Sequence, residues 1–280
     1  MPLASIVLVT LSGLVHAVWN LWAKRSESPL VFLWSFQWVA VAVYGPFGAF
    51  SLAANPPPAA GLLWLLLTVA LHGAYVLLLA RSYAMTDFSQ SYPLQRGVPP
   101  LLIPLLGVSL LGEHLPPVGW IGVFLIVFGV ALVGGGRSLS FGRRPALYLG
   151  LAVGLAIAAY TLVDKVTLHY LSPIALNACT SAGNLAVLTL PALRTGDARS
   201  AWREAPWLVI GAGILSTLSY LLFLYALNQG SAAAVAPMRS VGIVFGALLG
   251  VLLLREPQGP RRVAGAGLIT LGTVLLGIGA

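Results

Sequence analysis

Residues 82–113 read SYAMTDFSQSYPLQRGVPPLLIPLLGVSLLGE and place an arginine, Arg96, inside an apolar segment long enough to cross a bilayer. A charge at mid-membrane costs about 2.5–3.5 kcal/mol on insertion scales, so this side chain is expected to face protein or water rather than lipid. Prolines in the same stretch remove backbone hydrogen-bond donors, and the carbonyl groups that they free need polar partners at membrane depth. The stretch therefore predicts a helix that lines a cavity.

The composition of the 280-residue chain is typical of a protein embedded in a membrane. Hydrophobic residues make up 59% of it, charged residues only 8%, and the mean hydropathy is +0.93. At about 20 residues per span, the chain holds about ten helices and leaves no room for a soluble domain. We therefore predict an all-α polytopic membrane protein. Its spans are expected at residues 3–22, 30–52, 61–81, 88–111, 117–136, 145–168, 173–193, 206–227, 231–254 and 262–279.

The order of features in the first stretch recurs later in the chain. Residues 225–256 read YALNQGSAAAVAPMRSVGIVFGALLGVLLLRE, so that Arg239 takes the place of Arg96. A second match aligns without gaps, GLVHAVWNLWAK at residues 13–24 with GLAIAAYTLVDK at residues 154–165. The chain is therefore predicted to contain one structural unit twice.

The two units are predicted to be residues 1–140 and residues 141–280, each with five spans. Because five is an odd number, the second unit would enter the membrane from the side opposite to the first. The halves would then form an inverted repeat. Secondary transporters are built in this way, with the solute site near the membrane midplane between the halves.

Lysines and arginines in the loops predict the orientation. Nearly all of them fall on one face, whereas the face that holds both termini has only Lys165. The positive-inside rule then places both termini on the non-cytoplasmic side of a cell inner membrane. The net charge of +8 is accordingly interpreted as a topology signal, and no nucleic-acid partner is expected. The lipid bilayer is an expected partner, while the sequence predicts no particular oligomeric state.

No motif in the sequence predicts catalysis. The sequence shows none of the common catalytic motifs in a suitable structural context: no glycine-rich phosphate loop, HExxH run, CxxC pair or Ser/His/Asp arrangement. No enzyme activity, cofactor or metal site is therefore expected. The acidic residues fall near the ends of the predicted spans, which argues against proton-driven exchange of cationic drugs, since that usually needs a mid-helix carboxylate. They are Glu27, Asp87, Glu113, Asp164, Asp197, Glu204 and Glu256. Glu113 and Glu256 are expected to cap loops or to pair with basic residues.

Several of these features resemble one known family. The two five-helix halves, Trp19 and Lys24 in the first helix, the pair Gly112–Glu113 after the fourth and the following span that begins near Gly119 are similar to the EamA-type members of the drug/metabolite transporter superfamily. The second half departs from the pattern, because an arginine precedes its glutamate. The closest resemblance is to the YddG-like bacterial amino-acid exporters. It implies ten helices, inverted repeats and a central cavity for aromatic and other neutral amino acids.

Two predicted helices carry polar faces that could meet such a cavity. His16, Trp19 and Asn20 share one face of the first helix, either toward the cavity or in packing against a neighbouring helix. His72 lies in the middle of an apolar run, where a histidine needs water, a partner or a solute, and could titrate near neutrality. A structural bond from His72 to a backbone carbonyl is the alternative.

The two intramembrane arginines are candidate carboxylate anchors, because a guanidinium group offers two parallel donors to an anion. Alternatively, Arg96 and Arg239 could extend toward the membrane interface or bond the carbonyls that nearby prolines free. The predicted solute-binding residues are His16, Trp19, Asn20, His72, Tyr75, Gln90, Arg96, Tyr160, Thr161, Ser219, Tyr220 and Arg239. The predicted hinge residues are Pro93, Gly97, Pro99 and Pro237.

The main functional hypothesis is a transporter that exports small metabolites by alternating access. The site would be lined by helices 1, 3 and 4 and by their repeats 6, 8 and 9. On the resemblance, its small-molecule substrate would be a neutral or aromatic amino acid. A transporter of phosphorylated or nucleotide-linked metabolites, with the two arginines as an anion clamp, is one alternative. A receptor or scaffold that transports nothing is the other.

Overall fold

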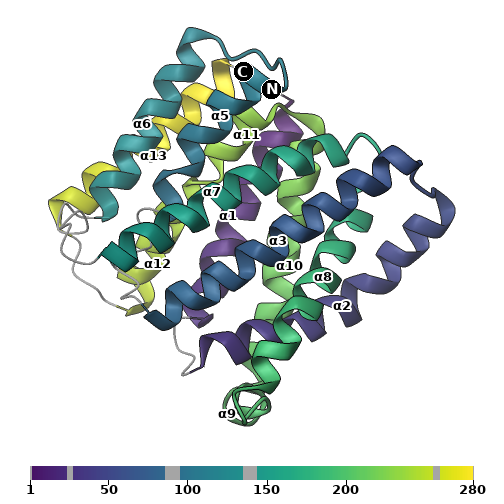
Figure 1. Ribbon diagram of the computed structural model, residues 1–280. Coiled ribbons are helices and arrows are strands. Elements are labelled where there is room, and N and C mark those ends of the chain that lie inside the picture. Colours follow the sequence, from purple (N-terminus) through teal and green to yellow (C-terminus); the bar gives the residue numbers. More distant parts are fainter. Residues whose placement is uncertain (1, 24–27, 86–94, 135–143, 255–258, 280) are drawn as a thin grey trace.

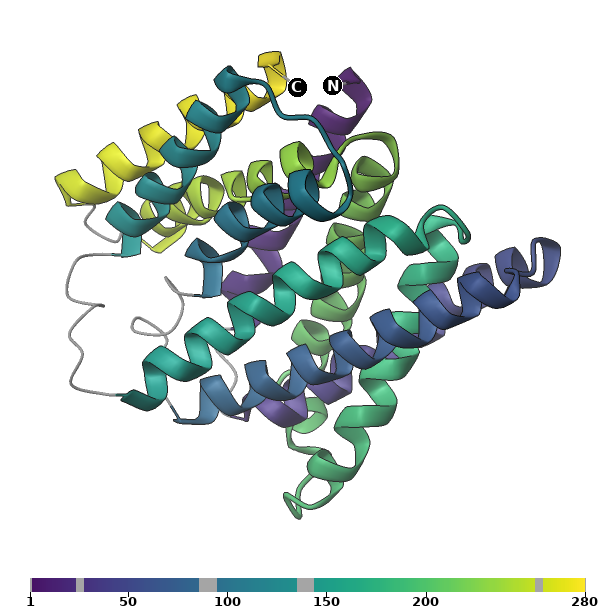
Figure 2. The same ribbon diagram turned by 45° about the horizontal axis from the view of Figure 1, so that its top comes forward.

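The computed structural model describes residues 2–23, 28–85, 95–134, 144–254 and 259–279, and every regular element in these ranges is a helix (Figure 1). Seven of the described helices are long and apolar enough to cross a membrane. The chain is therefore an all-α, multi-pass membrane protein. The first and last described residues lie near each other at one end of the molecule in both views (Figures 1 and 2).

The helices follow the predicted spans closely. The fourth span is described only from residue 95, and the rest of it lies outside the described residues. The ninth is divided in two, and a short extra helix precedes the eighth. In chain order the helices are α1 (Leu3–Ala23), α2 (Pro29–Ala54), α3 (Ala59–Met85), α5 (Pro99–Leu110), α6 (Pro117–Gly134), α7 (Arg144–Thr167), α8 (Pro173–Leu193), α9 (Ser200–Glu204), α10 (Pro206–Gln229), α11 (Ala232–Met238), α12 (Val241–Leu254) and α13 (Pro260–Gly279).

Local chemistry explains where many helices begin. Six of them start at a proline, whose missing N–H is not needed in the first turn. Ser172 and Ser231 stand just before α8 and α11, and each hydroxyl accepts a hydrogen bond of 3.3 Å from a backbone N–H three residues later. These caps satisfy donors that the first helical turn leaves open.

The main packing partners are far apart in sequence. The helix α6 packs against α13, α2 against α8, α1 against α10, and α3 against α7. Figure 2 shows the first of these pairs, with α6 in teal and α13 in yellow lying side by side. Since most contacts run between the N-terminal and C-terminal halves of the chain, the space enclosed by the helices lies between those halves.

Two breaks interrupt helical segments that carry arginines. The α11 helix ends at Met238 and α12 begins at Val241, so Arg239 lies in the turn between them. In the first half, residues 95–97 are helical, residue 98 forms a bend, and α5 begins at Pro99. The predicted hinge residues Gly97, Pro99 and Pro237 therefore lie at or beside breaks, while Pro93 lies outside the described residues. That these breaks bend during transport stays a prediction.

The α6–α13 pair depends on glycines at its crossing. A Cβ atom at Gly265 would lie 2.6 Å from the carbonyl oxygen of Gly129, and one at Gly272 would lie 2.5 Å from that of Gly122. Carbon atoms do not approach carbonyl oxygens this closely, so the two backbones can meet only where side chains are absent. Close packing at small residues is a main source of helix association in membranes, where lipid is as apolar as the protein.

We expect Gly265→Val to destabilise the protein by about 1–3 kcal/mol, because the new side chain must push the two helices apart. Thermal unfolding of the purified protein in detergent measures the effect. Gly267→Val is the matched control, since a Cβ atom at Gly267 of the same helix meets nothing within 4 Å. Equal midpoints for the two variants would contradict the assigned packing.

Candidate functional site

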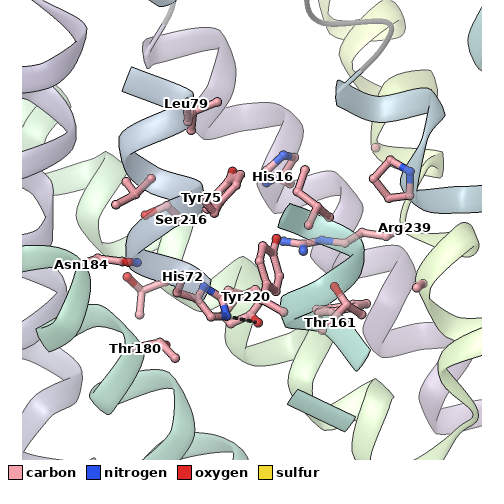
Figure 3. A pocket seen from close by; sticks show the side chains of 18 of the residues that line it. His16, His72, Tyr75, Leu79, Thr161, Thr180, Asn184, Ser216, Tyr220 and Arg239 are labelled. Atoms are coloured by element: carbon pink, nitrogen blue, oxygen red, sulfur yellow. Dashed lines mark hydrogen bonds between the residues drawn. The ribbon is translucent and has the colours of Figure 1, made fainter. Parts of the chain in front are cut away.

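The helices enclose a central cavity of about 160 Å³ (Figure 3). Side chains of α1, α3, α5, α7, α10 and the Arg239 turn contribute to its wall, as the sequence predicted for helices 1, 3, 4, 6, 8 and 9. Two further helices also contribute, α2 with Gln37 and α8 with Asn184 among others. The sequence did not predict either helix as part of the wall, although Asn177, Thr180, Ser181 and Asn184 share one face of α8 and were a signal for it.

Nine of the predicted binding residues meet at this cavity. They are His16, Trp19, His72, Tyr75, Arg96, Tyr160, Thr161, Tyr220 and Arg239. Their convergence from six separate segments is a geometric finding, while their contact with a solute stays a prediction. Gln90 lies outside the described residues, as does the side chain of Asn20.

Ser219 is placed differently from its prediction. It is fully buried and does not line the cavity. Its hydroxyl donates to the backbone oxygen of Ser12 at 2.9 Å, and the Ser12 hydroxyl donates to the backbone oxygen of Ser219 at 2.7 Å. This exchange fastens α10 to α1. Ser219 precedes Tyr220 by one residue, so it points about 100° away around the helix and into the helix interface.

Arg96 reaches the cavity wall and contacts His16. Its Nη2 atom is hydrogen-bonded to His16 Nε2, and the indole N–H of Trp19 points at the other ring nitrogen, Nδ1, at 3.2 Å. A neutral imidazole has a single acceptor nitrogen, so it cannot accept both hydrogen bonds at once. Arg96 and Trp19 thus compete for hydrogen bonding to His16. The guanidinium group of Arg96 faces the cavity rather than the membrane interface.

Arg239 also lines the cavity and lies against two aromatic rings. Its Cζ atom is 4.6 Å from the ring centroid of Phe223 and 5.5 Å from that of Tyr220, which is cation–π geometry. Its buried Nε atom has no hydrogen-bond partner among the described residues. This donor is costly to leave unpaired in an apolar interior, so the guanidinium group is suited to receive an acceptor from a solute.

A second unpaired polar atom belongs to Asn184. The Oδ1 atom of this buried side chain finds no donor within the described parts of the chain. Figure 3 shows Asn184 and Arg239 on opposite sides of the cavity, with His72 and Tyr220 between them. The residues that carry this buried acceptor and this buried donor thus line opposite sides of the cavity.

Asp164 lies near the end of its helix, as the sequence predicted, but the structure buries it completely. It is fully buried in α7, and its carboxylate accepts hydrogen bonds from the hydroxyl groups of Thr68 and Tyr220. His72 Nε2 lies 3.3 Å from its Oδ2 atom. Although Asp164 lies within one turn of the end of α7 in sequence, α3 and α10 cover it on both sides.

A sequence signal for this network existed. Thr68 and His72 are four residues apart on α3, and Tyr160 and Asp164 are four apart on α7, so each pair shares a helix face. The two faces meet, because the His72 ring stacks on Tyr160 with 4.0 Å between the ring centroids. The two polar faces could be recognised as one network only once α3 was known to pack against α7.

The corner between α10 and α11 is held by two charged side chains. Both carboxylate oxygens of Glu113 accept backbone N–H groups at 2.7 Å, one from Ala232 and one from Ala233, at the start of α11. Lys165 Nζ donates at 2.9 Å to the carbonyl oxygens of Leu227 and Gly230 at the end of α10. The prediction that Glu113 acts as a cap is confirmed by this geometry. The corner sets the direction of the segment that leads to Arg239.

We expect Glu113→Gln to lower the stability by about 1–2 kcal/mol, because the amide replaces a carboxylate oxygen that accepts a backbone N–H at a helix start. The unfolding midpoint in detergent is the measurement. Glu204→Gln, at an exposed position in α9, removes the same charge and should leave the midpoint unchanged. A Glu113→Gln midpoint equal to that of Glu204→Gln would contradict the capping role.

Within the described ranges, no group of three or more histidine, cysteine or acidic residues lies close enough together to hold a metal ion. The cavity wall offers a solute hydrogen-bonding groups, two arginines and aromatic rings.

Comparison with known proteins identifies the family of the second half of the chain. Residues 144–278 match the EamA-like transporter family. No curated protein matches the chain. Among solved structures, one published as "Crystal structure of protein" aligns over 98% of this chain and 95% of its own, with a TM-score of 0.72 and 17% sequence identity. At this identity the similarity supports the fold only.

Proposed function

We propose that this member of the EamA-like transporter family binds a neutral or aromatic amino acid in its central cavity and exports it across the cell inner membrane by alternating access. The family is one of membrane transporters in the drug/metabolite superfamily. The observation that carries the substrate class is a pair of unpaired polar atoms on two residues that line the cavity, the Nε of Arg239 and the Oδ1 of Asn184. One suits a carboxylate and the other suits an ammonium group.

The charges of the cavity favour a solute that carries a carboxylate. Arg239 and Arg96 both line the cavity, and Asp164, which could neutralise them, lies behind the wall with its oxygens engaged by Thr68, Tyr220 and His72. A guanidinium group binds a carboxylate through two parallel hydrogen bonds. The α-carboxylate of an amino acid would approach Arg239 and pair its buried Nε.

The remaining wall favours a small solute with an apolar side chain. Trp19, Phe36, Tyr75 and Tyr160 present aromatic rings in the cavity wall. A cavity of about 150 Å³ lined by apolar residues holds a benzene molecule in another protein, so the volume of about 160 Å³ suits a ring of that size. A nucleotide-linked metabolite would need far more room in this conformation.

The inverted repeat supplies the means of movement in this proposal. If the halves exchange, α1 corresponds to α7 and α3 to α10, and the observed pairs α1–α10 and α3–α7 then exchange with each other. The glycine contacts of α6 and α13 exchange in the same way. This correspondence supports two halves that rock about the cavity, with the helix breaks beside Gly97 and Arg239 as bending points.

Orientation is part of the same proposal. The termini lie at one end of the molecule (Figure 1), as an even number of spans requires. The basic loops lie on the face opposite to the termini in the predicted topology, so we place the termini on the non-cytoplasmic side.

A transporter of phosphorylated metabolites is the second candidate, because two arginines line one cavity. An anion of that class would use both arginines and would have no need of the open acceptor on Asn184. The scaffold hypothesis is less favoured, because a dry structural core gains nothing from an arginine nitrogen and an amide oxygen left unpaired.

We expect Arg239→Gln to raise the KM for labelled phenylalanine in liposomes by about 10- to 100-fold, because a charge-assisted hydrogen bond worth about 1.5–3 kcal/mol is lost. Arg199→Gln, in an exposed segment outside the cavity, is the matched control and should leave the KM unchanged. Unchanged phenylalanine transport by Arg239→Gln would reject Arg239 as the carboxylate anchor.

Asn184→Leu tests the proposed partner of the ammonium group. The wild-type protein should prefer phenylalanine over 3-phenylpropionate, its analogue without the amino group. In the variant this preference should be about tenfold smaller, because the partner of the ammonium group is gone. Competition of each compound against labelled phenylalanine measures the preference. A preference that survives the substitution would show that Asn184 does not bind the amino group.

A further inference from the structure

The polar network behind the cavity is larger than solute binding requires. Asp164 is fully buried and does not line the cavity, whereas His72, which contacts it, does. An imidazole, which can bind a proton at either ring nitrogen, thus connects the solute space to a carboxylate that the solute does not reach. Three partners hold this carboxylate in place, the hydroxyl groups of Thr68 and Tyr220 and the ring of His72.

Hydrogen-bond geometry determines which ring nitrogen of His72 carries hydrogen. The single hydroxyl hydrogen of Tyr220 goes to the Asp164 carboxylate. His72 Nε2 lies 3.1 Å from the Tyr220 oxygen and 3.3 Å from Asp164 Oδ2, and both oxygens can only accept from it. Nε2 therefore carries the hydrogen, and the lone pair is on Nδ1.

The other ring nitrogen is available from the cavity. No described residue makes a hydrogen bond to Nδ1, although this atom does not belong to the buried unpaired atoms. It is thus in contact with the space that the cavity offers. A proton arriving through cavity water would add at Nδ1, and the resulting imidazolium would keep its Nε2–H toward Asp164.

The charges around His72 are arranged for such a change. From α7 it faces the Asp164 carboxylate and the Tyr160 ring, and from α10 the Tyr220 hydroxyl. Tyr75 lies on its own helix, and the same cavity holds His16, Arg96 and Arg239. The arginines oppose a further positive charge, and the buried carboxylate opposite His72 balances it.

We propose that His72, held by Asp164, is a proton-binding site through which a proton gradient drives the solute in the opposite direction. The inference rests on the proposed function. With the solute carboxylate at Arg239, its ammonium group lies toward Asn184, on the side of His72 (Figure 3). Two positive charges in this small space repel each other, so proton and solute bind alternately, which is the requirement for exchange. One proton binds at Nδ1 from one side of the membrane and is released to the other side. The solute itself is not chemically changed.

The test uses the full-length protein in liposomes with the membrane potential clamped at zero. Two readouts are taken, uphill accumulation of labelled phenylalanine driven by a gradient of about one pH unit, and counterflow of phenylalanine at equal pH. One-for-one exchange supports about tenfold accumulation on the acidic side under this gradient. Asp164→Asn should lose this accumulation and keep counterflow, while Asp197→Asn, at an exposed position, should keep both.

A further readout does not depend on the variant folding. With a pH-sensitive dye trapped inside liposomes that carry the wild-type protein, a phenylalanine gradient should move protons against the amino acid. Wild-type counterflow without pH-driven accumulation, protons that move with the solute, or full accumulation by Asp164→Asn would each overturn the proton site and leave the proposed function standing. Absence of wild-type counterflow would overturn the proposed function itself.

Discussion

The structure depends on one constraint, that polar groups surrounded by lipid must find partners inside the protein. Asp164 shows how this is met. Its carboxylate is removed from both lipid and cavity, and the hydroxyl groups of Thr68 and Tyr220 reach it from α3 and α10. Satisfying one charge thus fixes three helices against one another. An uncompensated buried charge would cost several kcal/mol, so these helices cannot separate at this point without great loss.

The same constraint explains other contacts between the helices. Glu113 and Lys165 satisfy the backbone groups where α10 gives way to α11, and the glycines of α6 and α13 replace side-chain packing by backbone contact. Four buried polar side-chain atoms of the described residues have no hydrogen-bond partner; Arg239 and Asn184 carry two of them and line the cavity, whereas Ser5 and Ser35 carry the others and do not. A place where a fold leaves its own rule unmet is where a ligand is expected.

The sequence predicted the helices well because proline, glycine and charged residues mark span ends sharply, as the close match of α8 and α10 to their predicted spans illustrates. It predicted most of the cavity from polar residues in apolar runs. It placed Ser219 wrongly, since periodicity does not tell which neighbour a helix face meets. The sequence did not predict the burial of Asp164 for the same reason. This residue lies near a helix end and is buried only because α3 and α10 pack over it.

The most direct test of the central claim is counterflow with the wild-type protein. Liposomes loaded with unlabelled phenylalanine are diluted into labelled phenylalanine, and the label inside is followed over time. The account predicts transient accumulation of label that unlabelled threonine suppresses and a sugar phosphate does not. Exchange of the sugar phosphate in place of phenylalanine would contradict the assignment of the substrate, and equilibration no faster than in protein-free liposomes would contradict transport altogether.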